Sequence, residues 1–156
     1  MPDIDLPQDY EDLLRAFVAA GVDFLLIGGW AVAVHGHGRA TDDMDVLVRA
    51  ESENAIRVME ALREYGAPLA THGVTSELFS QPRDGYRMGR KPILIEILTR
   101  ISGVTFDEAS EGAVTVEIGG VSVRVIGRRA LIKNKRAAGR AKDLADVEAL
   151  EPDDDG

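Results

Sequence analysis

The chain has 156 residues, a length that suits one domain with a hydrophobic core, and its formal net charge at pH 7 is −9. This acidity argues against a protein that coats nucleic acid through bulk charge, and the lack of cysteine excludes disulfides and thiolate zinc sites. The sequence has neither a secretory signal pattern nor an apolar run of the roughly 18 residues that a membrane span requires. We therefore expect a cytoplasmic protein without membrane contact, with one domain over residues 1–150 and a disordered acidic tail over 151–156.

The first half of the chain alternates helical and strand patterns. Hydrophobic periodicity predicts a helix over residues 9–20, a strand over 24–27, a helix over 30–35, a strand over 44–48 and a helix over 53–65. Each of these helical segments is followed by a glycine, the residue that most readily adopts the left-handed conformation found after a helix.

The second half begins with a poorly periodic stretch, residues 70–91, which is rich in glycine, proline and arginine and predicts a loop with one strand at 76–80. A strand over 92–98, a hairpin of 113–118 with 121–126, and helices over 129–138 and 141–150 are expected to follow. This order predicts an α+β (α/β-like) fold, a mixed β-sheet flanked by helices, with a C-terminal helical pair.

Two aspartates, Asp43 and Asp45, lie one residue apart in the apolar run that ends at Val48. Residues two apart in a strand point to the same side, so both carboxylates project from one face. They repel each other unless a cation lies between them, and Mg²⁺ is a hard cation that prefers oxygen ligands. The alternative is a solvated strand end, an interpretation that the neighbouring Asp42 favours.

Gly28 and Gly29 stand where the first predicted strand turns into a helix. Without a Cβ, glycine lets a ligand approach the backbone closely, and the start of a helix suits a phosphate group. A simple tight turn is the alternative for this pair.

Glu96 is a single carboxylate among apolar residues of a predicted strand. A charged residue in such a run is rarely buried without a partner. If this strand lies beside the strand of Asp43 and Asp45, three carboxylates converge, which is an arrangement for metal-assisted phosphoryl or nucleotidyl displacement. The alternative for Glu96 is a salt bridge to a neighbouring arginine such as Arg100.

These features resemble the polymerase-beta-type nucleotidyltransferase superfamily, whose pattern is an apolar strand, Gly-Gly or Gly-Ser, a helix, Asp-x-Asp or Asp-x-Glu, and a third acid on another strand. Residues 25–48, LLIGGWAVAVHGHGRATDDMDVLV, are especially similar to its small stand-alone branch of lincosamide-type and abortive-infection toxin-like nucleotidyltransferases. Residues 131–150, LIKNKRAAGRAKDLADVEAL, resemble a C-terminal pattern of the toxin-like members. The resemblance implies the nucleotidyltransferase fold.

The resemblance also implies roles for particular residues. Gly28 and Gly29 would bind the triphosphate of a nucleoside triphosphate, and Asp43 and Asp45 would hold Mg²⁺ or Mn²⁺. Glu96 would be the third metal-binding and catalytic acid, assisting the attacking hydroxyl. The chain departs from the family pattern in having glutamate where aspartate is more usual, and Gly29 where a serine would contact phosphate.

Several cationic and polar residues are further candidates for nucleotide binding. Arg39 and Thr41 precede the acidic pair. Arg39 either neutralises the triphosphate or, as the alternative, pairs with Asp42 or orients Asp43. The stretch 124–142 has eight basic residues and no acidic one, and within it Lys133 and Lys135 are the candidate phosphate contacts. A solvated helix face is the alternative for these lysines.

Asp143 and Asp146 are expected to tie the last two helices together through arginine or lysine partners.

The function that these predictions favour is a Mg²⁺-dependent enzyme that moves a nucleoside monophosphate from a nucleoside triphosphate to a hydroxyl. The acceptor is left open among an RNA end such as tRNA, a protein and a small molecule, and a partner protein in a toxin–antitoxin pair is one hypothesis. The alternative is a catalytically weak or inactive nucleotide-binding protein that acts through a partner. A nucleic-acid-binding structural protein would depend only on the basic stretch, and the overall acidity counts against it.

Overall fold

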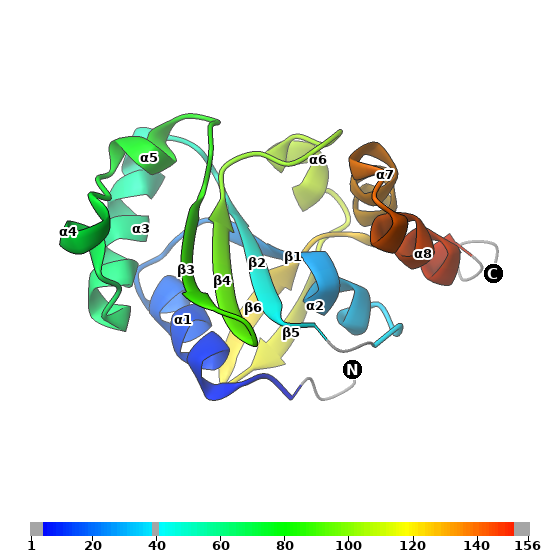
Figure 1. Cartoon of the computed structure of the whole chain (residues 1–156), viewed down its shortest axis with the longest axis horizontal. Helices are drawn as coiled ribbons and strands as arrows, with labels where there is room; N and C mark the ends of the chain where they lie inside the picture. The colour runs from blue at the N-terminus through cyan, green and yellow to red at the C-terminus, as the bar shows by residue number, and fades with distance from the viewer. Residues whose placement is uncertain (1–4, 39–40, 152–156) are drawn as a thin grey trace.

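A computed structural model describes residues 5–38 and 41–151 and arranges them around a mixed β-sheet (Figure 1). The strands of these residues are β1 (Phe24–Ile27), β2 (Asp43–Val48), β3 (Tyr86–Arg90), β4 (Ile93–Leu98), β5 (Val114–Ile118) and β6 (Val121–Val125), in the sheet order β3-β4-β2-β1-β6-β5. β2 pairs with β4, and β1 with β6, in parallel, whereas the other neighbours are antiparallel. The predicted α+β fold with a mixed sheet is confirmed.

Helices flank this sheet. They are α1 (Gln8–Ala19), α2 (Gly28–Val34), α3 (Ser52–Tyr65), α4 (Leu69–His72), α5 (Glu77–Ser80), α6 (Phe106–Ser110), α7 (Arg128–Ala138) and α8 (Ala141–Leu150). Figure 1 shows α1 and α3 packed together at one end of the molecule and α7 with α8 at the other. The predicted C-terminal helical pair is confirmed, and its two helices meet at Gly139, which has a φ of 70° and ends α7.

In the adjacent strands β2 and β4, acidic residues stand between buried apolar ones. Met44 and Val46 of β2 are buried, and Ile95 and Ile97 of β4 are buried beside them. Because successive strand residues point to opposite faces, this alternation sends the acidic residues between them to the opposite face of the sheet. Burial of one face therefore positions the carboxylates on the other.

The stretch 70–91 differs from the prediction. The strand expected at 76–80 is wrong, because these residues form α5, whose buried Phe79 faces α3. The strand in this stretch is β3, in which Tyr86 and Met88 are buried and Arg87 is exposed. Glycine and arginine have low strand propensity, and pairing with β4 along the whole strand compensates for it.

The sequence predicts the hairpin of β5 and β6 but not the short helix α6. The predicted hairpin of β5 and β6 is confirmed, and its turn residues Gly119 and Gly120 have φ angles of 58° and 83°, which a two-residue hairpin turn requires. The short helix α6 was not predicted, although Thr105 and Glu108 form a capping box at its start. Five residues are too few to show a helical period.

Candidate active site

Three carboxylates converge on one face of the sheet. Asp45 of β2 lies opposite Glu96 of β4 in the parallel register, and Asp43 precedes Asp45 by two residues on the same face. One oxygen from each of the three carboxylates lies within 4.8 Å of the corresponding oxygens of the other two. The sequence predicts this convergence only if the two strands are neighbours, and β2 and β4 are paired.

Asp45 is the electrostatic centre of this cluster. Its Oδ1 atom is buried and has no hydrogen-bond partner among the described residues. Burial, followed by repulsion from Asp43 and Glu96, raises the pKa of the Asp45 carboxyl from 3.8 to about 7, while Lys135 and Lys142 act in the opposite direction. A buried, unpartnered carboxylate oxygen beside two other carboxylates is a donor set that fits Mg²⁺ or Mn²⁺.

Gly28 makes close packing against this carboxylate feasible. It has a φ of 70°, and a Cβ on it would lie 2.7 Å from Oδ2 of Asp45. Ile27, the residue before it, pairs with Asp45 in the ladder between β1 and β2. The turn therefore lies directly beside the three carboxylates of Asp43, Asp45 and Glu96, here called the acidic row. Both the backbone angle and the lack of space therefore require glycine at this position.

Thr41 connects the glycine turn to the acidic pair. Its Oγ1 donates a hydrogen bond to Oδ1 of Asp43 at 2.8 Å, and a Cβ on Gly29 would lie 3.1 Å from that same Oγ1. The hydroxyl thus orients the Asp43 carboxylate. Contact between Thr41 and a nucleotide stays a prediction, and Arg39 lies outside the described residues.

The partner of Glu96 is an arginine that the sequence did not single out. Nη2 of Arg87 lies 3.0 Å from Oε1 of Glu96, and these two residues are opposite each other in the ladder between β3 and β4. Arg100, the arginine named in the salt-bridge alternative, pairs instead with Asp84 at 3.6 Å. Arg87 was missed because β3 was missed; the alternation of buried Tyr86 and Met88 around it was the available signal.

Tyr10 is a second residue beside the candidate site that the sequence did not single out. Its hydroxyl lies 3.1 Å from the carbonyl oxygen of Asp42 and 3.2 Å from that of Pro92, the residues just before β2 and β4. Burial and repulsion from Asp43 raise the pKa of this hydroxyl to about 12, so it remains a donor at physiological pH. One side chain of α1 thereby holds together the starts of the two strands that carry the carboxylates.

Lys135 is buried between the C-terminal helices, with 5% of its surface exposed. Its Nζ lies 3.3 Å from Oδ1 of Asp143 and 3.0 Å from Oδ2 of Asp146, which confirms that these aspartates tie α7 to α8. Nε of Arg140 lies 2.6 Å from Oδ2 of Asp143 and adds a second cation. The charge of Lys135 lowers the pKa of the Asp45 carboxyl. Direct contact of Lys135 with a nucleotide stays a prediction.

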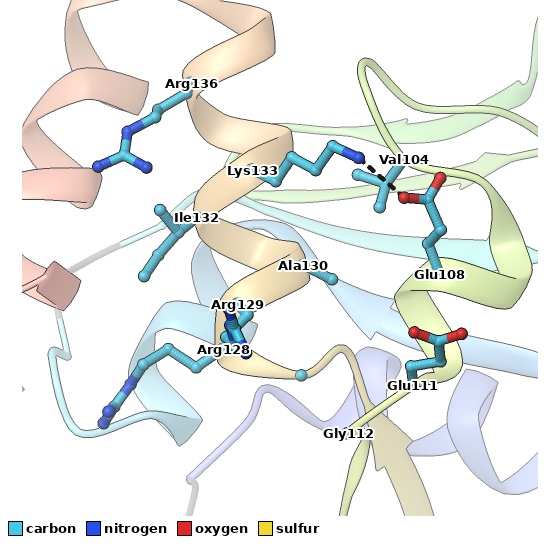
Figure 2. Close-up of a pocket in the computed structure, with 11 residues that line it drawn as sticks. Val104, Glu108, Glu111, Gly112, Arg128, Arg129, Ala130, Ile132, Lys133 and Arg136 are labelled. Atoms are coloured by element: carbon cyan, nitrogen blue, oxygen red, sulfur yellow. Dashed lines mark hydrogen bonds and ion pairs between the residues drawn. The ribbon is translucent and has the colours of Figure 1, made fainter. Parts of the chain in front are cut away.

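Lys133 lies elsewhere on α7. Its Nζ pairs with Oε2 of Glu108 at 2.8 Å, across a cavity of about 840 Å³ between α7 and residues 104–112 (Figure 2). None of the three converging carboxylates lines this cavity. The structure therefore does not bring Lys133 to the acidic row, and its role in nucleotide binding stays a prediction.

Three carboxylates on adjacent strands beside a Gly-Gly turn, on a mixed sheet with flanking helices, define the class of nucleotidyltransferases. Residues 7–152 match the family described as nucleotidyl transferase of unknown function, and the chain belongs to that family. It is therefore a nucleotidyltransferase-family enzyme with a nucleotide substrate. No curated protein matches the sequence.

Solved structures with the same fold include the lincosamide antibiotic adenylyltransferase LnuA with bound lincomycin, at 12% identity over 94% of this chain and 96% of that one, with a TM-score of 0.55. The antibiotic-resistance factor ANT(2'')-Ia is 15% identical over 93% of this chain and 84% of its own, with a TM-score of 0.55. An antigenic nucleotidyltransferase-like protein from Paracoccidioides brasiliensis is 15% identical over 92% and 76%, with a TM-score of 0.53. Identities this low establish a shared fold alone.

Within residues 5–38 and 41–151, no helix combines the length and the apolar character that crossing a membrane requires.

Proposed function

We propose that this protein is a Mg²⁺- or Mn²⁺-dependent enzyme that transfers a nucleoside monophosphate from a nucleoside triphosphate to a hydroxyl group. The observation that carries this proposal is the convergence of Asp43, Asp45 and Glu96, of which Asp45 has a buried carboxylate oxygen without a hydrogen-bond partner among the described residues. A carboxylate that is buried without a hydrogen bond is costly, and a bound cation removes that cost.

Each acid has a role in the proposed reaction. Asp43, Asp45 and Glu96 would hold the metal, and Thr41 keeps the Asp43 carboxylate in its orientation. When bound, divalent cations stabilise the charge on the attacking and leaving oxygens of an in-line displacement. The acceptor oxygen forms a bond to the α-phosphorus, and the bond from that phosphorus to the bridging oxygen breaks. Pyrophosphate leaves with the electron pair, and Glu96 accepts the proton of the acceptor hydroxyl.

The triphosphate is proposed to lie over Gly28 and Gly29, because neither residue has a side chain to hold it away from the backbone. Positive charge is available from the start of α8. The pKa of the Arg140 guanidinium is raised first by its hydrogen bond to Asp143 and also by the charges of Asp45 and Asp43, so it carries its charge close to the acidic row. The charge of Lys142 lowers the pKa of the Asp45 carboxyl, so this lysine also places positive charge near the carboxylates. These two cations are our proposed contacts for the triphosphate.

The acceptor in this proposal is a hydroxyl of an RNA end, a protein or a small molecule. A second candidate function is that of a weakly active member regulated by a partner protein, for example within a toxin–antitoxin pair. The specific observation in its favour is that Glu96 is already engaged by Arg87, which withdraws one of the three carboxylates from a metal.

The test is incubation of the purified protein with Mg²⁺ and each α-labelled nucleoside triphosphate. Total RNA, total protein, lincosamides and aminoglycosides are supplied as separate acceptor pools. The Asp43→Asn/Asp45→Asn variant is the inactive control, and Asp84→Asn/Asp107→Asn, which neutralises two exposed carboxylates, matches its change in charge. We expect label in one acceptor pool that is lost in the first variant and kept in the second.

Label that is equal in all three proteins would refute the proposed site. An absence of label in every pool, with nucleotide binding intact, would favour the partner-regulated alternative.

A further inference from the structure

We propose that Arg87 is a positioning residue that acts as a tethered counter-ion of Glu96 and competes with the divalent cation for that carboxylate. This inference deepens the proposed function and depends on it. In the absence of metal, the guanidinium would neutralise Glu96, and metal entry would require its displacement. Arg87 would thereby set the concentration of cation at which the site fills.

The sheet register brings the competing groups into one row. Arg87 of β3 lies opposite Glu96 of β4, and Glu96 lies opposite Asp45 of β2. Directly opposed residues in neighbouring strands have side chains on the same face and within contact distance. A cation bound to Asp45 and Glu96 would therefore share the Glu96 carboxylate with the guanidinium of Arg87.

Burial determines which way Arg87 points. Tyr86 and Met88 on either side of it are buried, so the alternation of the strand turns Arg87 to the open face that carries the acids. The side chain of Arg87 is 68% exposed and that of Glu96 is 21% exposed. An arginine this exposed reaches Glu96 from the rim of the site and is held weakly enough to be displaced.

The contact occupies a particular atom of Glu96. Nη2 of Arg87 donates to Oε1 at 3.0 Å, the only hydrogen bond to the Glu96 side chain within the described part of the chain. The buried Lys135 pairs with Asp143 and Asp146, so it is not a counter-ion of Glu96. A divalent cation bound to Glu96 would repel the guanidinium, because like charges at this separation disfavour each other.

The experiment measures Mn²⁺ affinity by calorimetry, without nucleotide or acceptor, for the wild type and for Arg87→Gln. Arg100→Gln and Arg90→Gln are matched controls. Both remove one exposed arginine charge near the β3–β4 hairpin, Arg100 pairs with Asp84 instead of the acidic row, and Arg90 is opposite Ile93. We expect Arg87→Gln to tighten Mn²⁺ binding about three- to tenfold and each control to change it less than twofold.

A measurement on the unmodified protein provides an independent check. Saturating Mg²⁺ should shift the Arg87 Nε–H resonance in a ¹⁵N spectrum, because the guanidinium is released from Glu96, while the Arg100 resonance should not move. The Arg87→Gln spectrum identifies the signal.

Mn²⁺ binding that is unchanged or weaker in Arg87→Gln, or equally tightened in the control variants, would overturn the inference and leave the proposed metal site intact. An Arg87 resonance that is insensitive to bound Mg²⁺ would have the same effect. A wild-type protein that binds no Mn²⁺ would overturn both this inference and the proposed function.

Discussion

Gly28 and Asp45 pack so closely that a Cβ at residue 28 would lie 2.7 Å from Oδ2 of Asp45. The sequence alone is compatible with two explanations for this glycine, a tight turn or the close approach of a ligand. The φ of 70° and the contact with Asp45 show that the protein itself requires glycine here. The structural requirement and the proposed phosphate contact arise from the same absence of a side chain.

Gly28→Ala should destabilise the protein more than an equivalent substitution elsewhere. Gly66→Ala is the matched control, because Gly66 has a φ of 95° and open space around its missing Cβ. The control should lose about 1–2 kcal/mol of unfolding free energy from backbone strain alone. Gly28→Ala should lose about 1–3 kcal/mol more through the clash with Asp45, and transfer activity should fall about 10- to 100-fold.

Urea unfolding and single-turnover transfer are the measurements for this pair of variants. Equal losses of stability at the two glycines would show that Asp45 moves aside at little cost.

Asp45→Asn should stabilise the metal-free protein in a pH-dependent way. The folded-state pKa of Asp45 is raised to about 7, so between about pH 4 and pH 7 the folded protein holds a proton that the unfolded chain has lost. The stability of the wild type therefore falls as the pH rises through that interval, because the unfolded chain ionises at residue 45 and the folded protein does not. The variant should gain on the order of 2–4 kcal/mol at pH 8 and nothing at pH 4.

Thermal and urea unfolding in EDTA at these two pH values provide the test. Asp84→Asn, at a carboxylate that is 99% exposed, is the control and should show no such pH-dependent gain. The explanation by burial fails if the gain from Asp45→Asn is equal at pH 4 and pH 8.

Thr41→Val should reduce transfer activity while leaving the fold intact. Valine has nearly the shape of threonine but lacks the Oγ1 that donates to Asp43 at 2.8 Å. Loss of a group that orients a metal ligand should lower Mn²⁺ affinity or activity about tenfold, and Thr41→Ser should retain both because its hydroxyl remains. Calorimetry and initial rates distinguish the variants; a Thr41→Val enzyme with wild-type values would remove Thr41 from the site.

Lys135 and Lys133 are two residues apart on α7 and should respond very differently to replacement by methionine. Lys135→Met leaves Asp143 and Asp146 buried without their shared partner and should cost about 3–5 kcal/mol of unfolding free energy. Lys133→Met removes only an exposed pair with Glu108 and should leave the free energy of unfolding nearly unchanged. Comparable costs in chemical denaturation would contradict the buried ion network.

Local information was sufficient for much of the fold. The alternation around Asp43, Asp45 and Glu96 depends only on neighbours in sequence, so it indicated which side chains share a face before any strand was placed. The glycine pair in the β5–β6 hairpin and the glycine between α7 and α8 are likewise local signals, because each marks a backbone angle that other residues disfavour. The strand predicted at 76–80 was wrong because five residues of mixed polarity support either structure, and packing of Phe79 beside α3 decided for a helix.

What the sequence by itself determined, then, is the set of carboxylates, the face from which each projects and the glycine turn that precedes them. Only the tertiary structure decided which groups meet. The pairing of β2 with β4 brings Glu96 to Asp45, the edge strand β3 supplies Arg87, and Tyr10 of α1 holds the starts of β2 and β4. Strand neighbours and helix docking arise from contacts between residues far apart in the chain, and no local pattern encodes them. For the same reason Lys133 and Lys135, neighbours in the basic stretch, have separate environments, one exposed beside Glu108 and one buried between α7 and α8.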